Sequence, residues 1–399
     1  MTSAGIADRS RSRSRAAPFS LAVGRKALCG TSALASAGLM AVGSGSAQAQ
    51  VKGIELGLGG FANEYLFVTS IDEDNSDSRD FNQVATHFDG EVHFTGKTTL
   101  DNGLTFGFQA ELELPTVGDQ IDEVFMTVEG DFGKFVLGGD NSASYVMGLG
   151  LWDPYVGVPI NSGWVSDFAP PPPGMTISFR SPAVSTAIDI TNDDNTFKYF
   201  TPRIAGFQFG VSYTPNASFS GNPTNGSVDT AGLTYSNGWS VAANYLGSFG
   251  DVDVGVSGGY ARASAGDAIE ALGGDDIQQV MTGGFVEYAG FKLAGSYAKE
   301  IDGRYNTAGT VSTEGQSWVA GLSYRTGPWA VGAAYFHGEV EGQIANNGND
   351  EQDAASIGVS YDIGPGVTAA VNGLYANYDT DEGEDSSALA ASVGFSLSF

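Results

Sequence analysis

The sequence predicts an all-β fold, a single sixteen-stranded antiparallel β-barrel that spans a membrane. Three observations carry this prediction. Beyond residue 50, segments recur in which bulky apolar residues alternate with small or polar residues. Short turns and long polar loops alternate between these segments. No stretch beyond residue 50 has the roughly 18 consecutive apolar residues of a membrane-spanning helix, so a helical membrane protein is excluded.

Residues 1–49 have the composition of an export signal. Six bases precede a weakly apolar run at residues 27–42: Arg9, Arg11, Arg13, Arg15, Arg25 and Lys26. Ala47-Gln48-Ala49 then matches the small-residue pattern after which a signal peptidase cuts. We therefore expect residues 1–49 to be removed and the mature chain to begin at Gln50. A soluble, disordered basic arm is the alternative.

The charge of the mature chain excludes one class of partner. The full sequence has 399 residues and a formal charge of −28, and removal of residues 1–49 leaves 12 bases and 45 acids, a formal charge of −33. A nucleic acid is an implausible partner for so negative a surface. The only cysteine, Cys29, lies in the removed segment, so the exported chain folds without disulfides. A closed sheet is one way to stabilise such a chain.

The clearest hairpin is "EVHFTGKTTLDNGLTFGFQAELEL", residues 91–114. Two alternating runs meet at Asp101-Asn102-Gly103, a sequence favoured in the tight turn of a β-hairpin. One face of the hairpin carries residues such as Phe94 and Phe106, and the other carries residues such as His93 and Lys97. The hairpin thus has one apolar and one polar face.

Similar turns and loops divide the rest of the chain. Seven short turns are predicted, at residues 101–103, 130–133, 203–206, 249–251, 288–290, 325–328 and 362–366. Long polar loops are predicted at residues 70–82, 115–120, 140–194, 215–238, 264–276, 301–316, 340–353 and 379–387. Seven hairpins with one strand before and one after give sixteen strands, although residues 227–236 leave a further strand open. An even count with short turns on one rim and long loops on the other is typical of outer-membrane barrels.

The direction of the two faces follows from the size of the barrel. Sixteen tilted strands enclose a lumen too wide for their own side chains to fill, so we expect the polar face to meet water inside and the apolar face to meet lipid. Aromatic residues near the strand ends support this arrangement, because amphipathic rings favour the membrane interface: Trp318, Tyr324, Trp329, Tyr335, Tyr361 and Tyr375. An arginine should therefore be tolerated at Thr95 or Ser257 but not at Phe94, Val254 or Leu322.

Four stretches then resemble a known family. They are "HFTGKTTLDNGLTFGFQAELE", "VFMTVEGDFGKFVLGGDNSAS", "DNTFKYFTPRIAGFQFGVSYTP" and the closing "VGFSLSF". In order and spacing they resemble the general porins of Gram-negative bacteria, of the alphaproteobacterial type. The resemblance implies a sixteen-stranded homotrimeric outer-membrane barrel over residues 50–399. It also implies that residues 140–194 form an inward-folded third loop that narrows a water-filled channel for passive diffusion of small hydrophilic solutes and ions. The terminal Phe399 resembles the assembly signal of such barrels.

The resemblance directs attention to the charges of this third loop. Residues 140–194 contain one base, Arg180, and six acids that we expect at the constriction: Asp140, Asp153, Asp167, Asp189, Asp193 and Asp194. The prolines at 170–173 favour a stiff, extended backbone that limits the swing of the loop. A surface spacer that never enters the pore is the alternative.

Alternation along the strands places seven charged or ionisable residues on the lumen face, and two lysines are further candidates. The expected pore wall therefore consists of His87, Asp89, Glu91, His93, Lys97, Glu111, Glu113, Lys134 and Lys198. Porins of this family often set a basic wall against an acidic loop, whereas here carboxylates are interleaved with few bases. The acid excess predicts a moderately cation-selective pore, because charged walls concentrate counter-ions. Neutralising Asp153 and Asp167 together should shift selectivity toward anions.

Other function classes have weaker support. The pairs His87 with Asp89 and His93 with Glu91 are explained as lumen positions, and no serine has a catalytic motif, so we expect no enzyme. No cofactor and no metal site are expected, because residues 72–77 and 379–385 match calcium-loop spacing only loosely. Divalent ions that bridge these acidic loops to lipopolysaccharide remain open. A substrate-selective porin and a non-conducting structural or adhesive barrel are the alternative functions.

Overall fold

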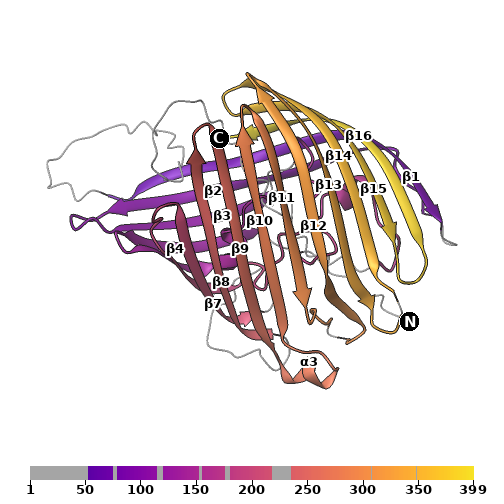
Figure 1. Ribbon diagram of the computed structural model, residues 1–399, viewed down its shortest axis with the longest axis horizontal. Helices are drawn as coiled ribbons and strands as arrows, with labels where there is room; N and C mark the ends of the chain where they lie inside the picture. Colours follow the sequence, from indigo (N-terminus) through magenta and orange to yellow (C-terminus); the bar gives the residue numbers. More distant parts are fainter. Residues whose placement is uncertain are drawn as a thin grey trace.

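The computed structural model describes residues 53–74, 79–114, 120–151, 155–175, 180–217, 235–306, 308–346 and 348–399. Sixteen antiparallel strands form one closed barrel, in which neighbours in the chain pair and β1 closes on β16 (Figure 1). The predicted strand number and topology are confirmed. Within the described ranges, no helix has the length and apolarity needed to cross a membrane. The expected export signal lies outside the described residues.

The elements have the following bounds. The strands are β1 Glu55–Asp74, β2 Val84–Thr99, β3 Thr105–Leu114, β4 Ile121–Gly130, β5 Gly133–Gly139, β6 Asn195–Phe200, β7 Phe207–Ala217, β8 Tyr235–Phe249, β9 Val252–Ala265, β10 Ile277–Tyr288, β11 Phe291–Ile301, β12 Val311–Thr326, β13 Trp329–Gln343, β14 Asp350–Gly364, β15 Val367–Asp379 and β16 Asp385–Ser398. The described helices are α1 Ala143–Val146, α2 Val165–Phe168 and α3 Asp267–Ala271.

All seven predicted short turns join consecutive strands. Gly103 and Gly290 show why glycine stands in these turns, because their φ angles of 84° and 86° belong to the left-handed region that side chains disfavour. The long connections lie at the other rim. The sequence left open a further strand at residues 227–236. Residues 235 and 236 begin β8, and residues 227–234 lie outside the described residues.

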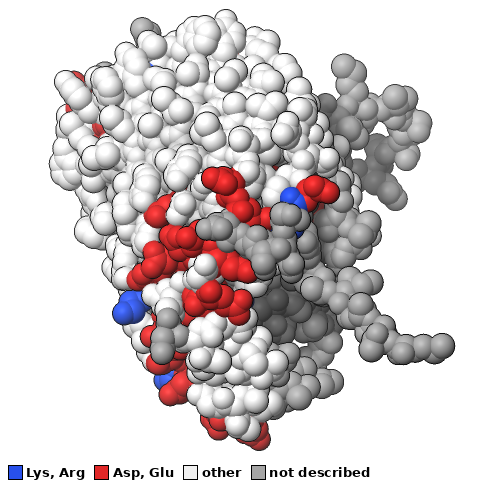
Figure 2. All heavy atoms as spheres, turned by 90° about the vertical axis from the view of Figure 1, so that its right-hand side faces the viewer, with Lys and Arg blue, Asp and Glu red and all other residues white. Residues whose placement is uncertain are grey.

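The outer face of the barrel is apolar, as expected. Phe94, Phe209 and Leu322 point outward from three separate strands, with 48%, 56% and 51% of their surface exposed. An apolar band of this extent does not suit water and marks a lipid-contacting surface. Figure 2 shows that Asp and Glu gather in the lower half of one side view, while its upper part is largely free of charged side chains.

Outward aromatic residues lie at two heights along the strands. Trp318 packs against Tyr335 with ring centroids 5.3 Å apart, and several residues closer to the short turns Trp329 packs against Tyr361 at 4.7 Å. Tyr324 stacks on Phe291 at the same lower height. These two levels are the arrangement expected for interfacial girdles.

The inner face differs from the uniformly polar surface predicted. Phe336, Leu374 and Tyr378 point inward from β13 and β15 and are almost fully buried. They pack in one cluster with Trp164 and Phe168 from the connection between β5 and β6. The reason is that this long connection brings its own apolar side chains into the barrel. The hydrophobic core of the described chain therefore lies inside the barrel.

The orientation of the barrel can be tested by proteolysis of intact cells. The connections β11–β12 and β13–β14 belong to the rim with long loops, which outer-membrane barrels expose to the outside. A broad-specificity protease added outside should therefore cut within residues 301–316 or 340–353. Cleavage at the short turns, near Gly327 or Gly364, would mean that the orientation is inverted. The fragment masses distinguish these outcomes.

Candidate functional site

In the connection between β5 and β6, residues 140–194, the described parts (140–151, 155–175 and 180–194) lie inside the barrel and follow its wall. In its first part the backbone N–H groups of Ala143, Ser144 and Leu149 donate hydrogen bonds to inward serines of β7, β8 and β9, at 3.1, 2.8 and 2.8 Å. In its returning part, the hydroxyl groups of Thr186 and Ser296 of β11 lie 2.5 Å apart. We call residues 140–194 the inner segment. Its contacts confirm that this loop enters the barrel.

Small inward residues make room for the inner segment. At Gly283 of β10, a Cβ atom would lie 2.2 Å from the carbonyl oxygen of Leu149. At Gly358 of β14, a Cβ atom would lie 2.0 Å from the carbonyl oxygen of Val156. Any side chain at these positions would have to displace the segment from the wall. The inward serine Ser257 is likewise covered, since it accepts the hydrogen bond from Leu149, so it is not the water-facing position predicted from the sequence.

The helix α2 fixes the middle of the inner segment. Trp164, immediately before α2, lies 4.6 Å from the ring of His87 between centroids, and Phe168 lies 4.6 Å from Phe67. The His87 Nδ1 atom is 3.2 Å from a carboxylate oxygen of Asp167. These contacts place α2 against the inner faces of β1 and β2. The segment is therefore held to the wall near its beginning, at α2 and in its returning part.

The structure corrects the expected role of most acids in this segment. Asp140, Asp189, Asp193 and Asp194 are at most 6% exposed, so they do not line an aqueous surface. Among the described acids of the inner segment, Asp167 is the one with an appreciably exposed side chain, at 22%. Asp153 lies outside the described residues. Burial has a physical reason here: most of these carboxylates accept hydrogen bonds or ion pairs that shape the segment itself.

Arg180 is the centre of that buried network. Its guanidinium donates to the side chain of Asn141 and lies 3.7 Å from Asp189 and 3.4 Å from Asp193. Its Cζ atom is also 4.6 Å from the ring centroid of Tyr145. The guanidinium thus joins the beginning of the inner segment to its end.

Burial alone would lower the pKa of Arg180, but the phenol of Tyr145 and the carboxylates of Asp193 and Asp189 raise it above its usual value. For Asp193 burial dominates and raises the pKa well above its usual range, against the opposing effect of Arg180. An arginine side chain stays protonated in proteins, so Arg180 supplies a positive charge to this network.

The expected wall residues all belong to inward-facing strand positions, yet they differ in exposure. Four carboxylates are buried and not exposed to the water of the lumen: Asp89, Glu91, Glu111 and Glu113. His87 is also buried, beneath α2. Lys198 is fully buried, because it pairs with Asp140 and donates to the carbonyl oxygen of Asn141 at 2.8 Å. Lys97 is exposed near the short turns, and Lys134 and His93 are half-buried.

Two further acids at this wall were missed by strand parity. Asp122 and Glu123 are neighbours in sequence, so alternation allows only one of them to face inward. Both are buried, at 1% and 0% exposure, because the pairing of β3 with β4 shifts register between Ala110 and Leu112. A β-bulge of this kind lets two consecutive residues share one face. The run of two acids at the start of a strand was the only signal for it.

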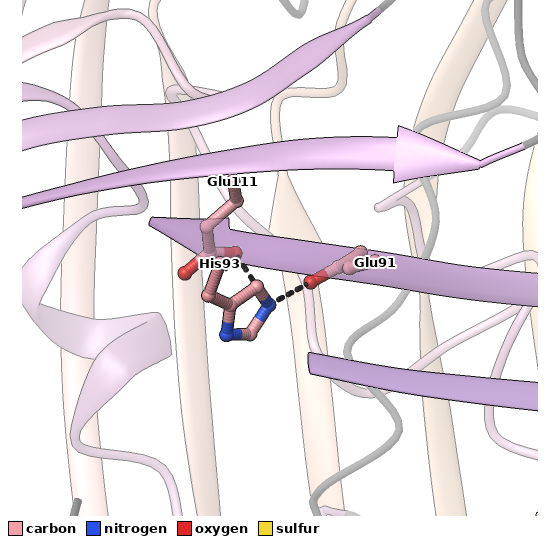
Figure 3. Close-up of side chains that lie close together, drawn as sticks. All are labelled: Glu91, His93 and Glu111. Atoms are coloured by element: carbon pink, nitrogen blue, oxygen red, sulfur yellow. Dashed lines mark hydrogen bonds and ion pairs between the residues drawn. The ribbon is translucent and has the colours of Figure 1, made fainter. Parts of the chain in front are cut away.

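Figure 3 shows the closest contacts in this part of the wall, among Glu91, His93 and Glu111. The Nε2 atom of His93 is 2.7 Å from Glu91 and 3.7 Å from Glu111. The imidazole is 26% exposed, whereas the two carboxylates are almost completely buried.

With this geometry established, the comparisons with known proteins identify the family. A family model described as Gram-negative porin matches residues 32–385. The chain belongs to the Gram-negative porin family. Among curated proteins, no relative matched.

Solved porin structures share the fold of this porin. An anion-selective porin from Comamonas acidovorans has a TM-score of 0.58 at 16% identity, covering 87% of this chain and 100% of its own. OmpT of Vibrio cholerae, expressed in the outer membrane, has a TM-score of 0.54 at 14% identity, covering 86% and 97%. The trimer form of OmpT has a TM-score of 0.53 at 14% identity, covering 87% and 99%. At these identities the likeness concerns the fold.

The family and the barrel together confirm the resemblance noted in the sequence. This porin is an integral protein of the outer membrane and forms a porin channel.

Proposed function

We propose that this porin lets small hydrophilic solutes and ions diffuse passively through the barrel, with a moderate preference for cations. The observation that carries the proposal is the inner segment, which lines the lumen of a barrel with a lipid-facing outer surface. Passive diffusion requires only an opening whose width and field decide what passes. The segment supplies such a narrowing, because its described parts follow the wall from β7 to β14, contact β1 and β2, and return past β12 and β11 to β6.

The distribution of charge supports a preference for cations, by a route different from the one predicted. Most acids of the inner segment are buried, so the constriction itself carries little exposed charge apart from Asp167. Exposed acids lie instead at both rims, for example Asp101, Asp131 and Asp251 at the short turns. Asp275, Glu314 and Glu382 are exposed at the rim with long loops. This rim would concentrate cations at the mouth of the channel. Screening over about 8 Å at physiological ionic strength limits the effect, so the preference should weaken as salt rises.

Single-channel recording in planar bilayers tests the proposal. In a salt gradient, the reversal potential of the wild-type channel should have the sign of cation preference. Asp167→Asn should shift it toward anions, because this carboxylate keeps contact with the lumen. The matched control is Glu64→Gln, which removes an exposed charge from the outer face of β1. It should leave the reversal potential unchanged.

Two results would contradict parts of this proposal. A channel that is already anion-selective at low salt would remove the cation preference and leave passive diffusion intact. Absence of any conductance from correctly folded protein would instead favour the non-conducting structural or adhesive barrel. A strong block of the current by one sugar would favour a substrate-selective porin.

We further propose a homotrimer surrounded by outer-membrane lipid and lipopolysaccharide. The trimer form of the similar OmpT supports the oligomeric state. Contact with lipopolysaccharide through divalent ions is supported by a row of outward carboxylates on adjacent strands, in which Glu351 faces Glu339 and Asp379. Native mass spectrometry of detergent-extracted protein, with and without EDTA, tests both. A monomer mass without bound lipid in either sample would contradict them.

A further inference from the structure

Five side chains that can ligate metals meet on the inner wall where β2, β3 and β4 lie side by side. Glu91 and His93 are two residues apart on β2, so they share one face of the strand. His93 stands directly opposite Glu111 of β3 in the register. The ligating atoms of these three side chains all lie within 4.8 Å of one another (Figure 3).

The β-bulge adds two oxygen ligands beside Glu111. Ala110 pairs with Val124 and Leu112 pairs with Ile121, so both Asp122 and Glu123 stand opposite Glu111. Carboxylate oxygens of Glu111, Asp122 and Glu123 form a second group within 4.8 Å of one another. Glu111 is common to both groups. The wall therefore presents one continuous set of a histidine and four carboxylates.

One atom of this set points to a missing ligand. Asp122 is 1% exposed, and its Oδ1 atom has no hydrogen-bond partner among the residues that the structure describes. A buried carboxylate oxygen without a donor is costly, because it has lost its water. A second unfavourable interaction lies close by, because Glu91 stands directly opposite Glu113 and like charges in such cross-strand pairs repel. A bound cation would relieve both.

Two buried bases of the barrel interior are engaged with the inner segment. Arg180 acts electrostatically on Asp122, but it pairs with Asp189 and Asp193 of the inner segment. Lys198 pairs with Asp140. These two bases therefore serve the attachment of the inner segment. His93 is the base that belongs to the wall cluster itself.

We propose that Glu91, His93 and Glu111 bind a divalent first-row transition-metal ion such as Zn²⁺, with Asp122 and Glu123 as the adjoining oxygen ligands. Imidazole with carboxylates is a ligand set that suits zinc. Ligand atoms about 2.0–2.1 Å from a tetrahedral ion are separated by about 3.3 Å, and the distances of 2.7 and 3.7 Å from His93 Nε2 bracket this value. The half-exposed imidazole provides a route from the lumen. The site is independent of the conduction properties proposed above.

Isothermal titration calorimetry of the full mature protein in detergent tests the site. Protein stripped with EDTA and titrated with ZnCl₂ should bind one ion per chain at this wall. His93→Gln and Glu111→Gln should each weaken the binding at least tenfold. The matched control is His337→Gln, because His337 lies on the outer face of β13 with a single carboxylate contact, 2.9 Å from Asp353. This control should retain the wild-type affinity.

Anomalous diffraction from wild-type crystals soaked in ZnCl₂ provides a second test that does not depend on how the variants fold. The expected result is a zinc peak beside His93 Nε2 and Glu111. A peak only at His337, no zinc binding at all, or an affinity unchanged in both variants would overturn the proposal. Calcium binding that survives His93→Gln, in a protein that does not bind zinc, would also overturn it.

Discussion

Leu322→Arg is expected to destabilise the folded porin by about 2 to 4 kcal/mol in lipid, the cost of an arginine near the middle of the apolar band of a barrel. Leu322 points outward and is 51% exposed. It lies on β12 between Trp318 and Tyr324, and therefore between the two aromatic levels. Equilibrium unfolding in urea, followed by tryptophan fluorescence in lipid vesicles, measures the difference in free energy.

The control for this variant is Thr95→Arg, which adds the same side chain to the inner face. Thr95 is half-buried and stands opposite Gly57, which leaves room for a longer side chain that reaches water. It should change the free energy of unfolding little. Equal costs at Leu322 and Thr95 would be incompatible with lipid outside and water inside.

Arg180→Met is expected to detach part of the inner segment and to cost about 3 to 5 kcal/mol, because it leaves the buried carboxylates of Asp189 and Asp193 without their cation. Arg180 has a φ angle of 59°. Methionine retains the strain of this left-handed backbone and an unbranched apolar stem, so the variant removes the guanidinium with its charge and its N–H donors. Single-channel recording should show frequent fluctuation between current levels, and unfolding should occur at lower urea.

Arg262→Met provides the comparison for this prediction. Arg262 forms an ion pair with Asp276 at an exposed position, where such pairs contribute little. Its current trace and stability should match the wild type. A quiet channel of unchanged stability in Arg180→Met would show that the inner segment does not depend on this guanidinium. Lowering the pH should reduce the defect, because the raised pKa of Asp193 lets this carboxylate take up a proton and lose its charge.

The barrel could be predicted because its signals are local. Alternation along each strand and glycine in the tight turns depend on residues close in sequence. The sequence of residues 91–114 therefore predicted the turn of this hairpin and its apolar and polar faces. The apolar inner wall could not be predicted in this way. Phe336 and Leu374 are inward positions covered by a segment about 200 residues earlier in the chain, and no periodicity within β13 or β15 records that contact.

The residues of the inner wall could be named from the sequence, but their burial could not. Parity correctly placed Glu91, His93 and Glu111 on the inner face. Asp122 broke the parity rule through a bulge, which follows from how β4 meets β3 rather than from β4 alone. Burial of the segment's acids also escaped prediction, because it depends on the folded path of the segment, which brings Arg180 to Asp189 and Asp140 to Lys198 of β6.

The position of α2 has a consequence for how the chain folds. β1 pairs with β16, so the seam that closes the sheet joins residues more than 300 positions apart, from Phe61 with Ser398 to Asp74 with Asp385. The short helix packs in the same cluster as Tyr65 of β1 and Ala388 of β16, and Tyr378 donates a hydrogen bond to Ala169 just after it. A peptide that precedes β6 in the sequence thus contacts β1 directly and shares one apolar cluster with β16. Because the entropy lost on joining two points of a chain grows with their separation, docking each margin onto this peptide divides one long-range encounter into two shorter ones.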